Sequence, residues 1–107
     1  MAQKIIYGTV SEDGTIISGQ EFAVETTEPG IYIITFAQAF ASPPCVVATL
    51  KNWGADNQIV VDNDERDKCQ IKIWDLEVTQ TSGSTGSKLE VRKENSAFNF
   101  IAIGEES

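Results

Sequence analysis

The stretch Gly30-Ile31-Tyr32-Ile33-Ile34-Thr35-Phe36 decides the fold class of this chain. Every residue after the glycine is β-branched or aromatic, as expected for a strand that is buried on at least one face. The preceding Glu28-Pro29-Gly30 is a turn signature, because proline presets φ and glycine accepts a left-handed backbone. Downstream, the pair Pro43-Pro44 cannot donate ladder hydrogen bonds and therefore marks the start of the next strand.

Similar short runs recur along the whole chain, about every eight to twelve residues, between clusters of Gly, Pro, Asn, Asp and Ser. They cover residues 5–10, 15–18, 22–25, 31–36, 45–51, 58–61, 68–78, 89–92 and 98–104. This pattern predicts an all-β fold, an antiparallel β-sandwich of six to eight short strands, with almost no place for a helix. Residues 79–87 combine Ser, Thr and Gly without apolar anchors, so we expect a mobile loop there.

Length and charge limit the function classes. A chain of 107 residues fits one domain, residues 1–107, with a single core. The formal charge of -8 repels phosphate backbones, and the few basic residues are scattered, so nucleic acid is not an expected partner. No apolar run approaches the length that crosses a bilayer, so we expect no membrane insertion. No secretory signal is visible at the N-terminus, which leaves the cytoplasm or a virion or extracellular site reached by a non-classical route.

The two cysteines, Cys45 and Cys69, are too few for a disulfide scaffold and are not spaced as a metal pair. Strand parity puts Cys69 in phase with the apolar Ile71 and Ile73, whereas Cys45 alternates with the apolar set that begins at Val46. The two thiols should therefore lie on different faces, which disfavours a bridge between them. We expect two reduced thiols.

The chain contains no histidine, which removes the commonest general base and the commonest metal ligand. The acidic segment with Asp62, Asp64, Glu65 and Asp67 offers carboxylates for glycosidic cleavage or for calcium. An exposed loop lacks the apolar burial that tunes a catalytic acid, and the spacing matches an EF-hand loop poorly. A solvated turn that blunts a sheet edge is the favoured interpretation, although calcium binding stays open. We predict that the protein is not an enzyme and needs no cofactor.

The two tryptophans are the best candidates for ligand binding. Trp53 lies in a polar loop and Trp74 on the polar face of the longest predicted strand. An aromatic ring can stack on the apolar face of a sugar while neighbouring carboxylates and amides bond its hydroxyls. The alternative is that each ring packs against a neighbouring subunit. The predicted site comprises Trp53, Asp56, Asn57, Trp74 and Asp75.

The order of several segments resembles H-type lectin domains and the related modules of phage tail-fibre tips and of bacterial β-sandwich proteins. The resemblance is carried by residues 30–36, by Phe40, by Pro43-Pro44 with Val46-Val47-Ala48-Thr49, and by 98–104. It implies an antiparallel sandwich that assembles as a homotrimer and binds sugars between subunits. The chain departs from the family at Phe100, where the lectins often have tryptophan, and in lacking the histidine of their sugar site. The resemblance therefore assigns no sugar-binding residue to this chain.

Two functions follow as predictions. The first is a non-catalytic carbohydrate-binding module that binds a glycan or cell-surface saccharide at or near the subunit interfaces of a homotrimer. The second is a structural domain, such as a receptor-binding tip or trimerisation domain of a phage-fibre-like assembly. In that case outward residues such as Val47 and Trp74 are buried against sister subunits.

Overall fold

The computed structural model describes residues 2–51, 57–80 and 87–107, and these form nine strands without a helix. All pairings between them are antiparallel, which confirms the predicted fold class with one strand more than the upper expectation. The described part of the chain holds no helix able to span a membrane. The strands are β1 Gln3–Val10, β2 Ile16–Gly19, β3 Phe22–Glu28, β4 Ile31–Phe36, β5 Cys45–Leu50, β6 Asn57–Asp62, β7 Lys68–Gln80, β8 Ser87–Lys93 and β9 Phe98–Glu105.

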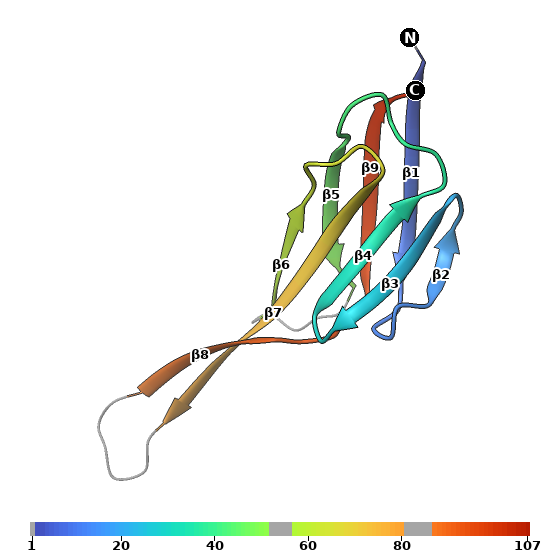
Figure 1. The fold of residues 1–107 in the computed structure, drawn as a ribbon. Helices are drawn as coiled ribbons and strands as arrows, with labels where there is room; N and C mark the ends of the chain where they lie inside the picture. Colours follow the sequence, from blue (N-terminus) through green and yellow to red (C-terminus); the bar gives the residue numbers. More distant parts are fainter. Residues whose placement is uncertain (1, 52–56, 81–86) are drawn as a thin grey trace.

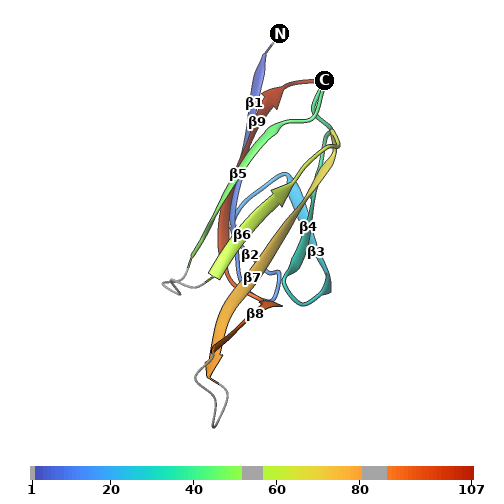
Figure 2. The ribbon, with the colours of Figure 1, turned by 90° about the vertical axis from the view of Figure 1, so that its left-hand side faces the viewer.

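The strands form two facing sheets (Figures 1 and 2). One sheet has the order β2-β1-β9-β5, and the other has the order β3-β4-β7-β6 with β8 pairing β7. In Figure 2 the first sheet lies on the left and the strands β3 and β4 of the second lie on the right. We call them the β1 sheet and the β4 sheet.

The core between the sheets is built by alternate residues of the strands, as two-residue periodicity requires. In β4 the buried residues are Tyr32, Ile34 and Phe36, which confirms the burial expected for this strand. Three edge-to-face ring pairs connect different segments of the chain, a geometry that aromatic quadrupoles favour. They are Phe22 with Phe100 at 4.9 Å between centroids, Tyr32 with Phe98 at 5.0 Å and Phe36 with Phe40 at 5.1 Å.

The cysteines lie as strand parity predicts. Cys69 is buried in the core and Cys45 is exposed, and neither forms a disulfide. Val46, Ala48 and Leu50, which alternate with Cys45, pack against the core. Burial raises the pKa of the Cys69 thiol to about 12, so this side chain behaves as an apolar core residue.

The turn before β4 requires glycine. Gly30 has φ +77°, a backbone conformation that residues other than glycine rarely adopt. A Cβ at this position would lie 2.6 Å from the carbonyl oxygen of Ile73. The Gly30 N–H donates to Oδ1 of Asn95 over 2.8 Å, which ties this turn to the segment before β9.

The second half of β7 and its partner β8 form a two-stranded ribbon that projects from the sandwich (Figure 1). The register runs from Trp74 opposite Lys93 to Gln80 opposite Ser87. Residues 79, 80 and 87 of the predicted mobile loop therefore belong to strands, whereas residues 81–86 lie outside the described residues.

Candidate functional site

The structure describes three of the five residues of the predicted sugar site. Trp53 and Asp56 lie outside the described residues, whereas Asn57 begins β6 and Trp74 and Asp75 lie in β7. In the β6–β7 register, Asn57 is opposite Asp75 and Gln58 is opposite Trp74. Because neighbouring residues of a strand face opposite sides of the sheet, Asn57 and Asp75 share one side and Trp74 takes the other. The fold thus brings Asn57 and Asp75 together and separates Trp74 from both.

Trp74 lies on the outer face of the β4 sheet, in phase with Lys72 and opposite in parity to the buried Ile73. Its side chain is partly buried, and its register neighbours are Gln58 and Lys93. Two ion pairs involve cations of this region: Lys72 Nζ lies 3.6 Å from Asp62 Oδ2 and Lys93 Nζ lies 2.6 Å from Glu28 Oε1. The surroundings are an aromatic surface with polar neighbours, which suits either a sugar or a protein contact.

The acidic segment between β6 and β7 is exposed and partly engaged in ion pairs. Lys68 Nζ lies 3.6 Å from Glu65 Oε2, in addition to the Lys72 pair with Asp62. The backbone carbonyls of Arg66 and Asp67 accept hydrogen bonds from Phe40 N and Phe36 N, so the segment closes one end of the sandwich. Within the described ranges no group of three or more ligand-type side chains is placed to hold a metal ion.

The outer face of the β1 sheet has a different character. Three cross-strand rows lie on it in register: Cys45–Ile103–Ile5, Val47–Ile101–Tyr7 and Thr49–Asn99–Thr9. None of these nine residues is charged, and we call this surface the uncharged face. Its third row is tied by a hydrogen bond of 2.7 Å from Thr9 Oγ1 to Asn99 Oδ1.

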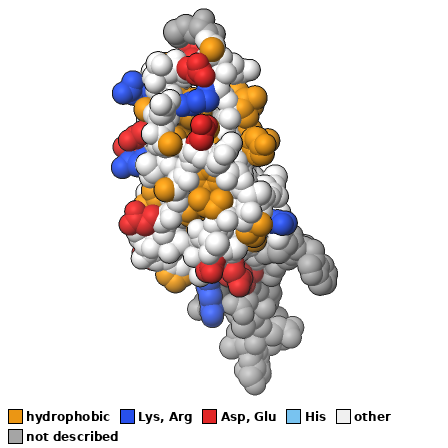
Figure 3. Space-filling model, turned by 90° about the vertical axis from the view of Figure 1, so that its right-hand side faces the viewer, with side chains coloured by type: hydrophobic (Ala, Val, Ile, Leu, Met, Phe, Trp, Pro, Cys, Tyr) orange, Lys and Arg blue, Asp and Glu red, His pale blue; other side chains and the backbone are white. Residues whose placement is uncertain are grey.

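The uncharged face is strongly exposed. Tyr7 is 63% exposed, Val47 57% and Ile5 53%, and Ile101 and Ile103 are also exposed. A hollow of about 90 Å³ lies between β5 and β9 and is lined by Val47 and Ile101 among others. Figure 3 views the molecule from the β2 side and shows hydrophobic side chains along the upper right profile, where the β1 sheet lies.

The sequence indicated this face only in part. Outward Val47 was expected to contact sister subunits, but the rows depend on the pairing of β1 with β9, which are far apart in sequence. The sequence feature that points to this face is a pair of segments, Ile5-Ile6-Tyr7 and Phe100 to Ile103. In both, consecutive residues are apolar, so apolar side chains lie on both faces of the strand. Strands that are apolar on both faces are expected to be covered on both.

Comparisons with known proteins leave the family open. No protein-family model, no curated protein and no solved structure matches the chain. The resemblance to H-type lectins therefore stays a prediction.

Proposed function

We propose that the protein is a non-catalytic binding domain that works as an assembly of identical copies, joined through the uncharged face. The observation that carries this proposal is the exposure of Ile5, Tyr7, Val47, Ile101 and Ile103 on one sheet face. Their exposed fractions correspond to roughly 500 Å² of mainly apolar surface, the upper end of what monomeric proteins usually expose. With the flanking Cys45, Thr49, Thr9 and Asn99, the face approaches the ~800 Å² that a stable interface buries per partner.

Charge favours a second copy as the occupant. Each chain carries a formal charge of -8, so two copies repel each other wherever their carboxylates meet. The nine residues of the uncharged face carry no carboxylate, and the nearest one in register on this face is Glu105, opposite Gln3 at its end. The outer face of the β4 sheet carries Glu25, Asp62, Lys68 and Lys72 and lacks this property. The resemblance to H-type lectins implies three copies in the assembly.

The absence of histidine from the sequence and the exposure of the acidic segment support a role without catalysis. A structural or tip domain of a larger assembly needs only the self-association and a free outer surface. In such an assembly the opposite face, on the β4 sheet, stays available to a ligand.

Saccharide binding at Trp74 is the second candidate. It is favoured by one observation, a partly exposed tryptophan on the outer face of the β4 sheet between Gln58 and Lys93. On this account a glycan array probed with the folded protein gives binding that Trp74→Leu weakens more than tenfold. An array without any signal, or equal binding by Trp74→Leu, contradicts it.

Self-association is tested by sedimentation equilibrium of the protein and of two matched variants. Ile101→Glu places a carboxylate at the centre of the uncharged face, whereas Val60→Glu places one on the outer face of the β4 sheet at nearly the same exposure, 45% against 43%. An unpaired buried charge costs several kcal/mol, so Ile101→Glu should weaken association by about 100-fold or more. Val60→Glu should assemble as the parent protein does. A monomeric parent protein at micromolar concentration, or equal effects of the two substitutions, contradicts the proposal.

A further inference from the structure

One edge of β1 lies open over half of its length. On one side β1 pairs β9 from Gln3 to Val10, whereas on the other side β2 pairs only Gly8, Thr9 and Val10. The β2 ladder stops at Gly19, and the segment Gly19-Gln20-Glu21 turns away towards β3. Within the described ranges, residues 3–7 of β1 therefore have a strand partner on one side only.

The direction of the backbone groups at this edge follows from one hydrogen bond. Ala2 O accepts from Glu106 N at 2.9 Å, in register with the β1–β9 ladder. In an antiparallel pair, alternate residues direct both their N–H and their C=O group to the same neighbour. The backbone N–H and C=O groups of even-numbered residues of β1 thus point to β9. Those of Gln3 and Ile5 point to the open edge. Such groups are a template for an added strand.

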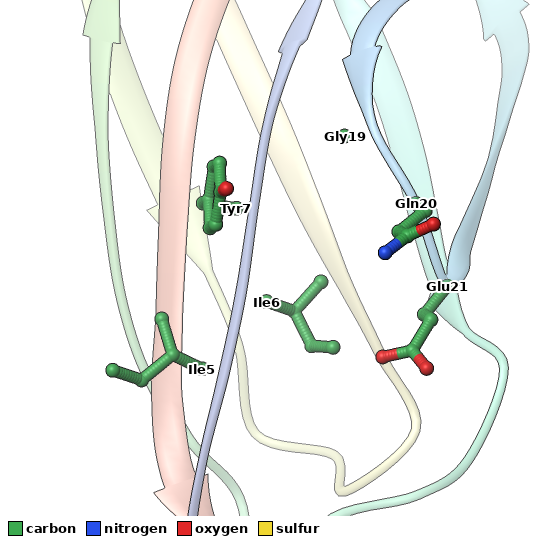
Figure 4. Close-up of a pocket in the computed structure, with 6 residues that line it drawn as sticks. All are labelled: Ile5, Ile6, Tyr7, Gly19, Gln20 and Glu21. Atoms are coloured by element: carbon green, nitrogen blue, oxygen red, sulfur yellow. The ribbon is translucent and has the colours of Figure 1, made fainter.

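A pocket lies beside this edge. Its volume is about 310 Å³, and its lining comprises Ile5, Ile6, Tyr7, Gly19, Gln20 and Glu21. Figure 4 shows the side chains of Gln20 and Glu21 extending towards β1 from across the opening. Glu21 has φ +70°, an uncommon value for a residue with a side chain, and its carbonyl is held by a 2.8 Å hydrogen bond from Ala37 N.

The pocket has an anionic wall. Among the lining residues that the structure describes, Glu21 alone is charged, and it is exposed. The neighbouring cation, Lys4, is engaged elsewhere: its Nζ donates to Gln38 O at 2.9 Å and lies 4.4 Å from the centroid of the Phe40 ring. A ligand that enters between β1 and Glu21 therefore meets backbone donors and acceptors on one side and a carboxylate and an amide on the other.

We propose that this edge binds an extended basic peptide, which adds to β1 as a strand and places a lysine or arginine beside Glu21. Main-chain hydrogen bonds to Gln3 and Ile5 supply the affinity, and the Glu21 carboxylate supplies the preference for a cation. The edge N–H and C=O groups point along the plane of the sheet, whereas the side chains of the uncharged face point perpendicular to that plane. Ile5 and Tyr7 belong to both surfaces, because they line the pocket at the edge and their side chains lie on the uncharged face.

Three short acetylated and amidated peptides test the proposal, with alternating valine and lysine, alternating valine and glutamate, and alternating valine and lysine with N-methylated valines. Binding is followed by amide chemical shifts of the full-length protein. The lysine peptide should shift residues 3–7 and 19–21 in a saturable manner and slow hydrogen exchange of the Ile5 N–H. The N-methylated peptide should lose this binding, because it lacks the donors of an added strand.

Two variants separate the charge from the edge. Glu21→Gln should weaken binding of the lysine peptide about threefold, the size of one exposed ion pair. Glu25→Gln, which neutralises an exposed glutamate of β3, should leave binding unchanged. Equal binding of the N-methylated peptide, equal binding of the glutamate peptide, or shifts confined to other surfaces each overturns the proposal. Loss of self-association in the sedimentation experiment leaves these shifts unaffected.

Discussion

Replacing Tyr32 by phenylalanine isolates the contribution of one buried hydroxyl that ties three segments together. The Tyr32 hydroxyl donates to Glu12 O at 2.5 Å and accepts from Ser96 N at 3.2 Å. Tyr32 is 0% exposed and Ser96 is 2% exposed, so the second bond is shielded from water. The hydroxyl thus joins β4 to the turn after β1 and to the segment before β9.

The cost of Tyr32→Phe follows from these two bonds. Each typical hydrogen bond contributes about 1 kcal/mol net, and loss of a partner for a buried donor costs about 1–3 kcal/mol. The Glu12 carbonyl belongs to an exposed turn and can bond water instead, so we expect a total loss of about 2 kcal/mol. The aromatic contact with Phe98 is kept, because the ring stays in place.

Urea unfolding at one protein concentration measures this loss, with Thr35→Val as the control. Thr35 is exposed on the outer face of β4, away from the uncharged face, so removal of its hydroxyl should change the free energy of unfolding by less than about 0.5 kcal/mol. Tyr32→Phe should shift the midpoint at an unchanged slope. Equal midpoints for the two variants would refute the assignment of the Tyr32 hydroxyl as a structural tie.

Three further predictions concern other parts of the fold. Cys45 should react with a thiol reagent in the folded protein, whereas Cys69, whose pKa burial raises to about 12, should react only in denaturant; reaction of both at one rate contradicts the core described here. Gly30→Ala should lower the unfolding free energy by roughly 2 kcal/mol in the same urea titration, because φ is +77° and the added Cβ meets Ile73 O. Gly14→Ala should cost less, because its added Cβ meets a methyl group of Thr26. Hydrogen bonds from Ser11 and Thr15 lower the Asp13 pKa below 3.8, so the contribution of the Asp13 carboxylate to folding stability is present above that pH and is lost on acidification. Asp13→Asn should therefore flatten the acid limb of the stability–pH profile. An acid limb that this substitution leaves unchanged would contradict the role of Asp13.

Strand parity was sufficient to predict much of the fold. It placed Cys69 inside and Cys45 outside. Residue type, six consecutive β-branched or aromatic residues, identified β4. The same rule, applied to Trp74 and Asp75, would have separated these neighbours to opposite faces of β7. Grouping them into one site rested on their proximity in sequence alone.

The remaining features depend on contacts between distant segments. The uncharged face forms because β9 pairs β1 on one side and β5 on the other, and no local pattern specifies that order. The open edge of β1 arises because β2 ends at Gly19 and Glu21 takes a positive φ, a conformation that its residue type does not predict. The opposition of Asn57 and Asp75 depends on the β6–β7 register, which the connection of residues 63–67 sets.

The burial of Cys45 on assembly tests the uncharged face most directly, since this thiol lies in its first row. We predict that the reaction rate of Cys45 with a small water-soluble reagent falls as protein concentration rises and copies associate. Ile101→Glu should keep the rate high at every concentration. A rate that stays constant while the sedimenting mass increases would show that the copies meet through another surface.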